Sequence, residues 1–137
     1  MAVTYKAAFK SFKANVKKGG TVIAQDVAYQ LAEKVVLLTP VDTTRAEANW
    51  NAALNTFLFD YNENARNSGG NRPNLDKAKT VAGKLKLGDE FVMANAAPYI
   101  KRLEEGWSQQ APNGMVAVTT ALFGRMVEKA ASRRKSN

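Results

Sequence analysis

The side chains that could perform chemistry in this chain are carboxylates, lysines and hydroxyls, because its 137 residues include no cysteine and no histidine. Disulfide bonds, thiol nucleophiles, Cys/His zinc sites and catalytic triads with an imidazole base are therefore excluded. A metal site would have to be built from carboxylate and carbonyl oxygens. Nucleases often need acids with a nearby lysine, but no Asp/Glu-x-Lys triplet occurs in the sequence. Composition alone rules out most catalytic chemistry.

Glu104 and Glu105 are the pair of acids that could be proposed as a general acid and base. Adjacent residues on a helix point about 100° apart, so the two carboxylates cannot easily share one reacting centre. The sequence also lacks a phosphate-binding loop, a Gly-x-Ser-x-Gly nucleophile elbow and a calcium-binding loop. We therefore expect a protein that is not an enzyme and that uses no cofactor and no metal.

The remaining chemical feature is positive charge. Twenty Lys and Arg against twelve Asp and Glu give a net charge of +8, which fits a polyanionic partner, an acidic protein partner or simply a solvated surface. The apolar spacing from Tyr5 to Lys18 predicts a basic amphipathic helix within residues 1–20. Four lysines at helical spacing would form its basic face: Lys6, Lys10, Lys13 and Lys17. This face could meet DNA, a membrane surface or an acidic partner, or stay solvated while the aromatic residues dock on the core.

The elements that position these residues are expected from apolar periodicity. A long helix is predicted over 21–38, stopped by Pro40, and a second helix over 75–85 with an Asn74 cap. Period-two alternation predicts strand structure within 50–61 and a strand over 90–95. A short helix over 99–105 and a final helix from Met115 follow. We predict one α+β domain over residues 1–137, with a long N-terminal helix pair and a C-terminal helix packed on a small, mostly antiparallel sheet.

Two segments are expected to lie outside this framework. Residues 62–74 are rich in turn formers and contain no large apolar side chain, which predicts an exposed loop. Residues 132–137 predict a frayed basic tail. No apolar run approaches the ~20 residues that cross a bilayer, and the N-terminus lacks the features of a signal peptide. We expect a protein made in the cytoplasm, with no membrane partner.

Two blocks of the sequence resemble the neck and tail-completion family of long-tailed bacteriophages. The first block is Leu38-Thr-Pro-Val-Asp-Thr-Thr-Arg-Ala-Glu-Ala-Asn-Trp50. The second block runs from Leu87 to Val116 and contains Asn-Ala-Ala-Pro-Tyr, Leu-Glu-Glu-Gly-Trp-Ser and Ala-Pro-Asn-Gly-Met-Val in the family's order. One position departs from the family, because Thr44 stands where glycine usually follows Pro-Val-Asp-Thr. A β-branched residue resists positive φ, so either the turn differs here or Thr44 caps a helical turn with Glu47 as its capping-box partner.

The resemblance implies a structural virion protein of the neck region, assembled in the host cytoplasm. It implies a homo-oligomeric ring, of six or twelve copies, that helps to join the DNA-filled head to the tail. Its partners would be neighbouring head-tail connector, tail-terminator or tail proteins, and DNA would pass through the lumen without sequence-specific contact. The alternative, based on charge, is a small nucleic-acid-binding protein.

The second block contains the residues that we expect at a subunit or partner interface. Trp107 follows a glycine and precedes a polar loop, and tryptophan anchors interfaces more often than most residues. The opposite reading is that Trp107 folds back onto its own core. The candidate interface residues are Tyr99, Arg102, Glu105, Trp107, Gln109 and Gln110.

Overall fold

The computed structural model describes residues 5–10, 20–41, 44–58 and 60–135, with only the backbone described for 5–10 and 134–135. The elements follow one another along the chain as β1 (Tyr5–Lys10), α1 (Gly20–Leu38), α2 (Arg45–Ala48), β2 (Trp50–Leu54), α3 (Pro73–Ala82), β3 (Glu90–Asn95), α4 (Ile100–Glu104), α5 (Val116–Ala121) and α6 (Phe123–Lys135). The fold is α+β, as the sequence predicts. Within the described residues, no helix combines the length and apolar character needed to cross a membrane.

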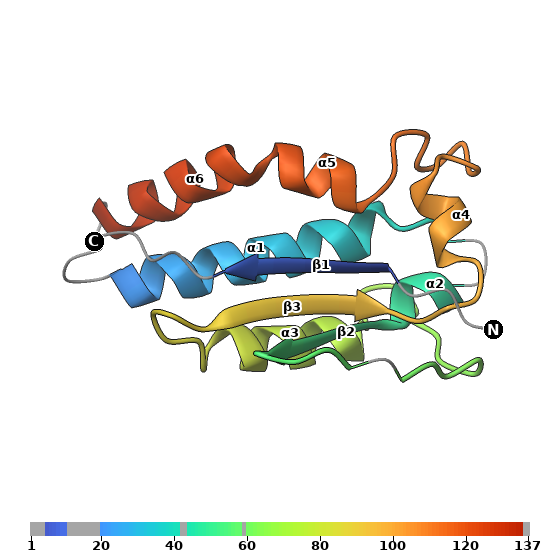
Figure 1. Cartoon of the computed structure of the whole chain (residues 1–137), viewed down its shortest axis with the longest axis horizontal. Coiled ribbons are helices and arrows are strands. Elements are labelled where there is room, and N and C mark those ends of the chain that lie inside the picture. Colours follow the sequence, from blue (N-terminus) through green and yellow to red (C-terminus); the bar gives the residue numbers. More distant parts are fainter. Residues whose placement is uncertain (1–4, 11–19, 42–43, 59, 136–137) are drawn as a thin grey trace.

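A three-stranded antiparallel sheet in the order β1-β3-β2 forms one layer of the fold (Figure 1). The central strand β3 pairs with both neighbours over its length, so that Met93 lies opposite Ala7 on one side and Ala52 on the other. In Figure 1, α1 and α3 lie behind the sheet, while α5 and α6 run along the far side of α1. The long helices therefore form a second layer on one face of the sheet.

The core lies between this helical layer and the sheet. Its sheet side consists of Trp50, Ala52, Phe91 and Met93, which alternate along β2 and β3 as period-two patterning requires. Alanines and valines of α1 and the apolar face of α3 complete it: Ala24, Ala28, Ala32, Val35, Val36, Leu75, Ala78 and Ala82. A second cluster joins Val27 and Leu31 of α1 to Met126 and Ala130 of α6. These buried faces lie on the helices that the sequence predicts over 21–38, over 75–85 and from Met115.

The N-terminal helix is the main error of the sequence prediction. Residues 5–10 form β1, which pairs along the whole of β3. Residues four apart share a face of a strand as well as a face of a helix, so the spacing of Tyr5 and Phe9 fits both structures. Pairing with an existing sheet satisfies the backbone of β1 and decides between them. The rest of the predicted helix, residues 11–18, lies outside the described residues. The predicted N-terminal helix pair is therefore wrong at its first member.

Four smaller expectations are also corrected. Strand β2 ends at Leu54, because Asn55 adopts a positive φ of 61° and turns the chain away from the sheet. The final helix is interrupted at Leu122 between α5 and α6. The helix α6 continues to Lys135, so the described part of the basic tail is helical, and Arg133 forms an ion pair with Asp26 across to α1. The cap expected from Asn74 is not formed, because α3 begins at Pro73.

Candidate functional site

The two blocks that carry the family resemblance meet at one end of the molecule, where α2 and α4 lie (Figure 1). The buried Asn95 side chain donates a hydrogen bond to the Ala46 carbonyl at 2.8 Å, which ties the second block to the first. The exposed Val41 N–H donates to Oε1 of Gln110 at 3.0 Å, which ties them again. The blocks are distant in sequence but form one continuous structure.

Glu104 organises the second block as the anchor of the loop between α4 and α5. Its Oε1 accepts the backbone N–H groups of Met115 and Val116, both at 2.8 Å, and its Oε2 accepts that of Ala117 at 3.0 Å. These N–H groups begin α5 and have no partner within the helix, so a buried carboxylate both satisfies them and complements the helix dipole. Glu104 is thus committed to a structural role, and the exposed Glu105 lies outside this arrangement.

Two glycines make the closure of this loop possible. Gly106 and Gly114 have positive φ angles of 89° and 83°, which residues with a Cβ rarely adopt. A Cβ at Gly114 would lie 2.5 Å from the carboxylate of Glu104, and one at Gly106 would overlap the Pro112 carbonyl. The glycines, the proline and Glu104 of the block therefore fix one loop shape.

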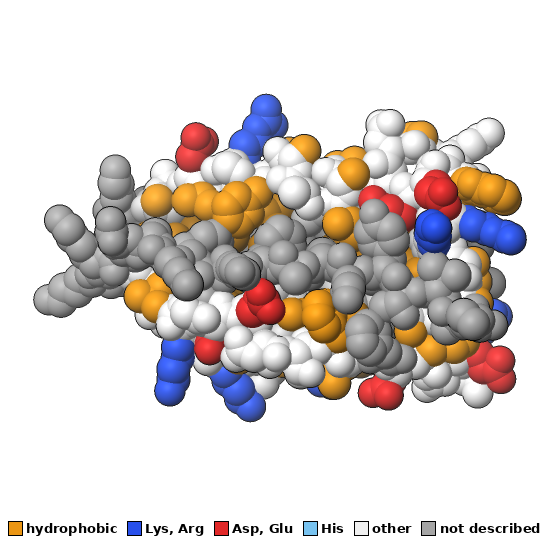
Figure 2. All heavy atoms as spheres, in the orientation of Figure 1, with side chains coloured by type: hydrophobic (Ala, Val, Ile, Leu, Met, Phe, Trp, Pro, Cys, Tyr) orange, Lys and Arg blue, Asp and Glu red, His pale blue; other side chains and the backbone are white. Residues whose placement is uncertain are grey.

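Trp107 lies on the outside of this fixed loop, with 70% of its surface exposed. Its backbone N–H donates to the Arg102 carbonyl, and the Arg102 guanidinium lies 5.1 Å from the centre of the indole ring. This contact orients the ring through a cation–π interaction without covering it. Figure 2 shows hydrophobic side chains next to both basic and acidic ones at the α4 end of the molecule. Trp107 is not part of its own core.

Most of the other candidate interface residues are also on the surface. Arg102, Glu105, Gln109 and Gln110 are exposed, and Tyr99 is half-buried. Burial raises the pKa of the Tyr99 hydroxyl above its usual value, and the neighbouring Tyr61 adds to this shift. The same Tyr61 hydroxyl hydrogen-bonds Arg45 and raises the pKa of its guanidinium. Tyr61, a residue that the sequence analysis did not select, therefore connects the two blocks.

Thr44 resolves the departure from the family pattern. It adopts the left-handed conformation, with φ 59° and ψ 5°, which is the conformation that a glycine would favour there. Its hydroxyl does not cap α2, so the expected capping box is wrong. The hydroxyl instead donates to the Asn67 carbonyl at 2.8 Å and accepts the Asn67 N–H at 2.9 Å. Thr44 thus adopts a strained backbone and holds the loop 62–72 against α2.

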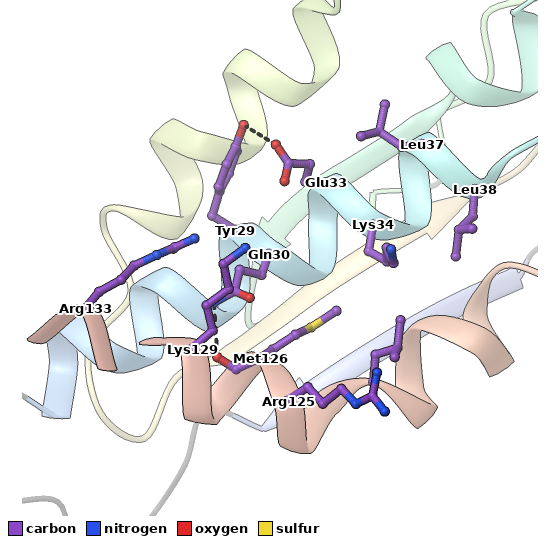
Figure 3. A pocket seen from close by; sticks show the side chains of 11 residues that line it. Tyr29, Gln30, Glu33, Lys34, Leu37, Leu38, Arg125, Met126, Lys129 and Arg133 are labelled. Carbon is purple, nitrogen blue, oxygen red and sulfur yellow. Dashed lines mark hydrogen bonds between the residues drawn. The ribbon is translucent and has the colours of Figure 1, made fainter. Parts of the chain in front are cut away.

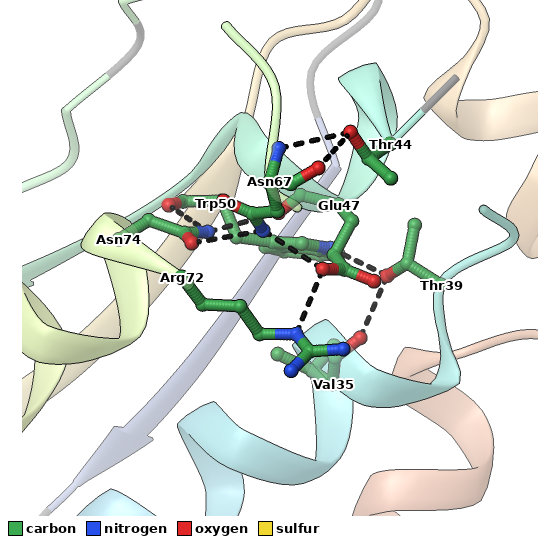
Figure 4. Close-up of polar contacts among 8 residues, drawn as sticks. All are labelled: Val35, Thr39, Thr44, Glu47, Trp50, Asn67, Arg72 and Asn74. Atoms are coloured by element: carbon green, nitrogen blue, oxygen red, sulfur yellow. Dashed lines mark hydrogen bonds and ion pairs between the residues drawn. The ribbon is translucent and has the colours of Figure 1, made fainter. Parts of the chain in front are cut away.

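The capping-box partner, Glu47, has a different role at the centre of a polar network (Figure 4). Its side chain is 2% exposed, and its Oε1 accepts from Arg72 Nε at 2.9 Å and from Asn67 Nδ2 at 2.8 Å. Asn74 donates to the Glu47 carbonyl at 2.8 Å. The predicted loop over 62–74 is therefore confirmed up to the start of α3, but Asn67 is buried within it.

The lysines proposed as a basic face are not arranged on a helix where the structure describes them. Lys6 and Lys10 belong to β1, opposite Ala94 and Glu90. Lys13 and Lys17 lie outside the described residues. The basic helix on which this hypothesis depended is therefore absent over 5–10.

A feature that the sequence analysis missed is a groove between α1 and α6 (Figure 3). It has a volume of about 570 Å³ and is lined by Lys34 and Leu38 of α1 and by Arg125, Met126 and Lys129 of α6, among others. The basic residues of 125–135 were visible in the sequence. Their position opposite Lys34 depends on how α6 packs on α1, which periodicity does not reveal.

The described residues contain no cluster of metal ligands, and the comparisons with known proteins give no relative. Across the residues that the structure describes, no three carboxylates lie close enough together to hold a metal ion. Comparison with family models, with curated proteins and with solved structures returned no match. Function is therefore inferred from the site itself and from the sequence blocks that form it.

Proposed function

We propose that this chain is a structural protein of the neck or tail-completion region of a tailed-phage virion, where it forms a ring that helps to join the head to the tail. The observation that carries the proposal is Trp107, which is 70% exposed on a loop whose shape is fixed by Glu104 and two glycines. A rigid loop with an exposed aromatic side chain suits a partner interface, because binding then orders few additional groups.

The location of the resembling blocks supports the same function. They cover about a third of the chain, yet they form one continuous structure through Asn95, Gln110 and Tyr61. Arg102 beside Trp107 adds a charged group to the aromatic one, and both residue types are enriched in interface hot spots. The proposed interface consists of Trp107 and Arg102, with Tyr99, Glu105, Gln109 and Gln110 around them.

The alternative, a small nucleic-acid-binding protein, keeps the support of the net charge but loses that of a basic helix over residues 5–10. The two functions make different predictions for the purified chain. A ring subunit should associate with itself independently of DNA, whereas a nucleic-acid-binding monomer should form a complex that weakens steeply with salt.

Size-exclusion chromatography with light scattering, with and without duplex DNA, tests the proposal. We expect a ring-sized particle whose mass DNA does not change. Trp107→Ala should melt like the wild type, because the indole side chain is exposed. The variant should nevertheless lose self-association or binding to the adjacent virion ring. Removing a central aromatic anchor typically costs about 2 kcal/mol or more of binding, roughly a thirtyfold loss at each interface.

Leu87→Ala is the matched control, because Leu87 is also an exposed large apolar residue, at 42%, but belongs to a turn before β3. It should leave the particle unchanged. A monomer that binds DNA in a salt-dependent way would instead support the alternative function. A Trp107→Ala variant that assembles normally would move the interface away from this loop.

A further inference from the structure

The groove between α1 and α6 carries an inference that goes beyond the proposed function. The two helices pack through Val27 and Leu31 against Met126, and Gln30 reinforces the contact by donating to the Met126 carbonyl at 3.1 Å. Arg133 of α6, which also lines the groove, forms an ion pair with Asp26 of α1. The groove therefore has its walls on two helices that pack against each other (Figure 3).

The rim of the groove is positively charged on both helices. Lys34 lies on α1, and Arg125 and Lys129 lie on α6. Among the residues that the structure describes, no carboxylate forms an ion pair with any of these three. The single acid in the lining, Glu33, lies within hydrogen-bond distance of the Tyr29 hydroxyl, at 3.5 Å. Four basic side chains and one carboxylate line the groove, and one of the four, Arg133, is paired with Asp26, so the lining keeps a net positive charge that favours an anionic occupant.

Apolar side chains lie between these charges. Leu37 and Leu38 of α1 line the groove together with Leu122 and Met126 near the start of α6. Leu37 is 48% exposed, so part of the apolar lining is open to a partner. From residue 29 to residue 38 the groove follows α1 for about 14 Å at 1.5 Å per residue, or about two and a half helical turns.

We propose that this groove binds an acidic amphipathic helical segment of another protein. The leucines and Met126 would contact the apolar face of that segment, and Lys34, Arg125 and Lys129 would pair with its carboxylates. Two packed helices with a groove between them are a common receptor for a third helix. Nucleic acid fits less well, because phosphate contacts gain nothing from exposed leucines at the centre of the site.

Isothermal titration calorimetry with a 14-residue synthetic helix, with glutamates on one face and leucines on the other, tests this proposal. The wild-type chain should bind the peptide, more weakly as salt rises, and should bind a version with serine at the leucine positions at least about tenfold more weakly. The triple variant Lys34→Glu/Arg125→Glu/Lys129→Glu should lose about tenfold or more of the affinity.

Matched controls separate a specific groove from general attraction. Lys77→Glu/Lys79→Glu/Lys84→Glu changes the net charge by the same amount at exposed positions on or just after α3 and should bind like the wild type. Leu37→Ser should weaken binding, whereas Leu87→Ser should not, although the two leucines are similarly exposed. Because Leu37 is half exposed, this variant keeps the proposal testable even if the triple variant fails to fold.

Three results with the peptides would overturn the proposal: no binding at millimolar concentration, equal losses of affinity for the two charge-reversal triple variants, or equal affinities for the leucine and serine peptides. Tighter binding of a duplex DNA oligonucleotide than of the peptide, lost in the Lys34/Arg125/Lys129 triple variant, would also overturn it. That result would assign the groove to nucleic acid instead. None of these results depends on whether Trp107 mediates ring formation.

Discussion

The carboxylate of Glu104, at the end of α4, accepts the N–H of Met115 at 2.8 Å and so closes a ten-residue excursion of the chain at its base. Most residues between these two are exposed on a loop with fixed ends, and the buried Ala111 attaches the loop to the core. Trp107 is held on this loop by its contact with Arg102. The relationship explains how a short polar segment with no regular structure can present an aromatic side chain in one orientation.

The first prediction concerns this cap. Glu104→Ala removes the acceptor for three N–H groups at the start of α5 and should lower the free energy of unfolding by about 1 to 3 kcal/mol. Glu105→Ala is the control, since that side chain is exposed, and it should stay within about 0.5 kcal/mol of the wild type. Urea unfolding measures both. Equal stability of the two variants would contradict the capping role.

The second prediction concerns the glycine beside that carboxylate. Gly114→Ala introduces a Cβ 2.5 Å from Glu104 at a positive φ, so it should be destabilising by more than about 1 kcal/mol. Gly124→Ala is the matched control, because a Cβ there meets no atom and the residue lies in α6. That substitution should stabilise by about 0.5 to 1 kcal/mol. Thermal or urea unfolding should show that the two substitutions change the free energy of unfolding in opposite directions.

The parts of the fold that could be predicted are those where one periodic signal acts alone. The faces of α1 and α3 and the bounds of β3 follow directly from apolar spacing. The strand β1 could not be recognised this way, because the spacing of Tyr5 and Phe9 fits a helix as well as a strand, and the choice depends on pairing with β3. Register with a partner strand is a long-range property.

The candidate site shows the same limit. The exposure of Trp107 was one of two open possibilities, since composition cannot tell whether an aromatic side chain in a loop folds inwards. The role of Glu104 as a cap could not be predicted from the sequence, because it depends on α5 beginning beside its carboxylate. Thr44 and Glu47 matched a capping box by spacing, yet both side chains bind Asn67, which is twenty or more residues away in the sequence.

The third prediction concerns that buried network. Glu47→Ala leaves Arg72 and Asn67 without their carboxylate and should cost about 2 kcal/mol or more of folding stability. Glu63→Ala, at an exposed acid in the neighbouring loop, should be nearly neutral. A double-mutant cycle with Arg72→Ala separates the ion pair from the other bonds. A coupling energy near zero would mean that Asn67 alone satisfies Glu47.

The fourth prediction concerns pH. Asp89 accepts the Lys86 N–H at 2.8 Å and an N–H of Asn55 at 3.1 Å, and these bonds hold its pKa below the usual value. Because the folded pKa is lower than the unfolded one, Asp89 stabilises the fold above about pH 4, and this contribution is lost as the pH falls further. The free energy of unfolding should therefore fall less between neutral pH and about pH 3 in Asp89→Asn than in the wild type. An unchanged pH dependence would contradict this assignment.

The last prediction uses Thr44 to separate backbone strain from hydrogen bonding. Thr44→Ala removes both bonds to Asn67 but keeps a Cβ in the left-handed conformation, whereas Thr44→Gly removes the same bonds and relieves the strain. Strain of this kind is worth about 1 kcal/mol, so the glycine variant should be more stable than the alanine variant by roughly that amount. Urea unfolding of the three proteins gives both differences. The difference in the free energy of unfolding between the wild type and Thr44→Gly then shows whether the two hydrogen bonds outweigh the strain. Equal stability of the alanine and glycine variants would mean that residue 44 is not left-handed in solution.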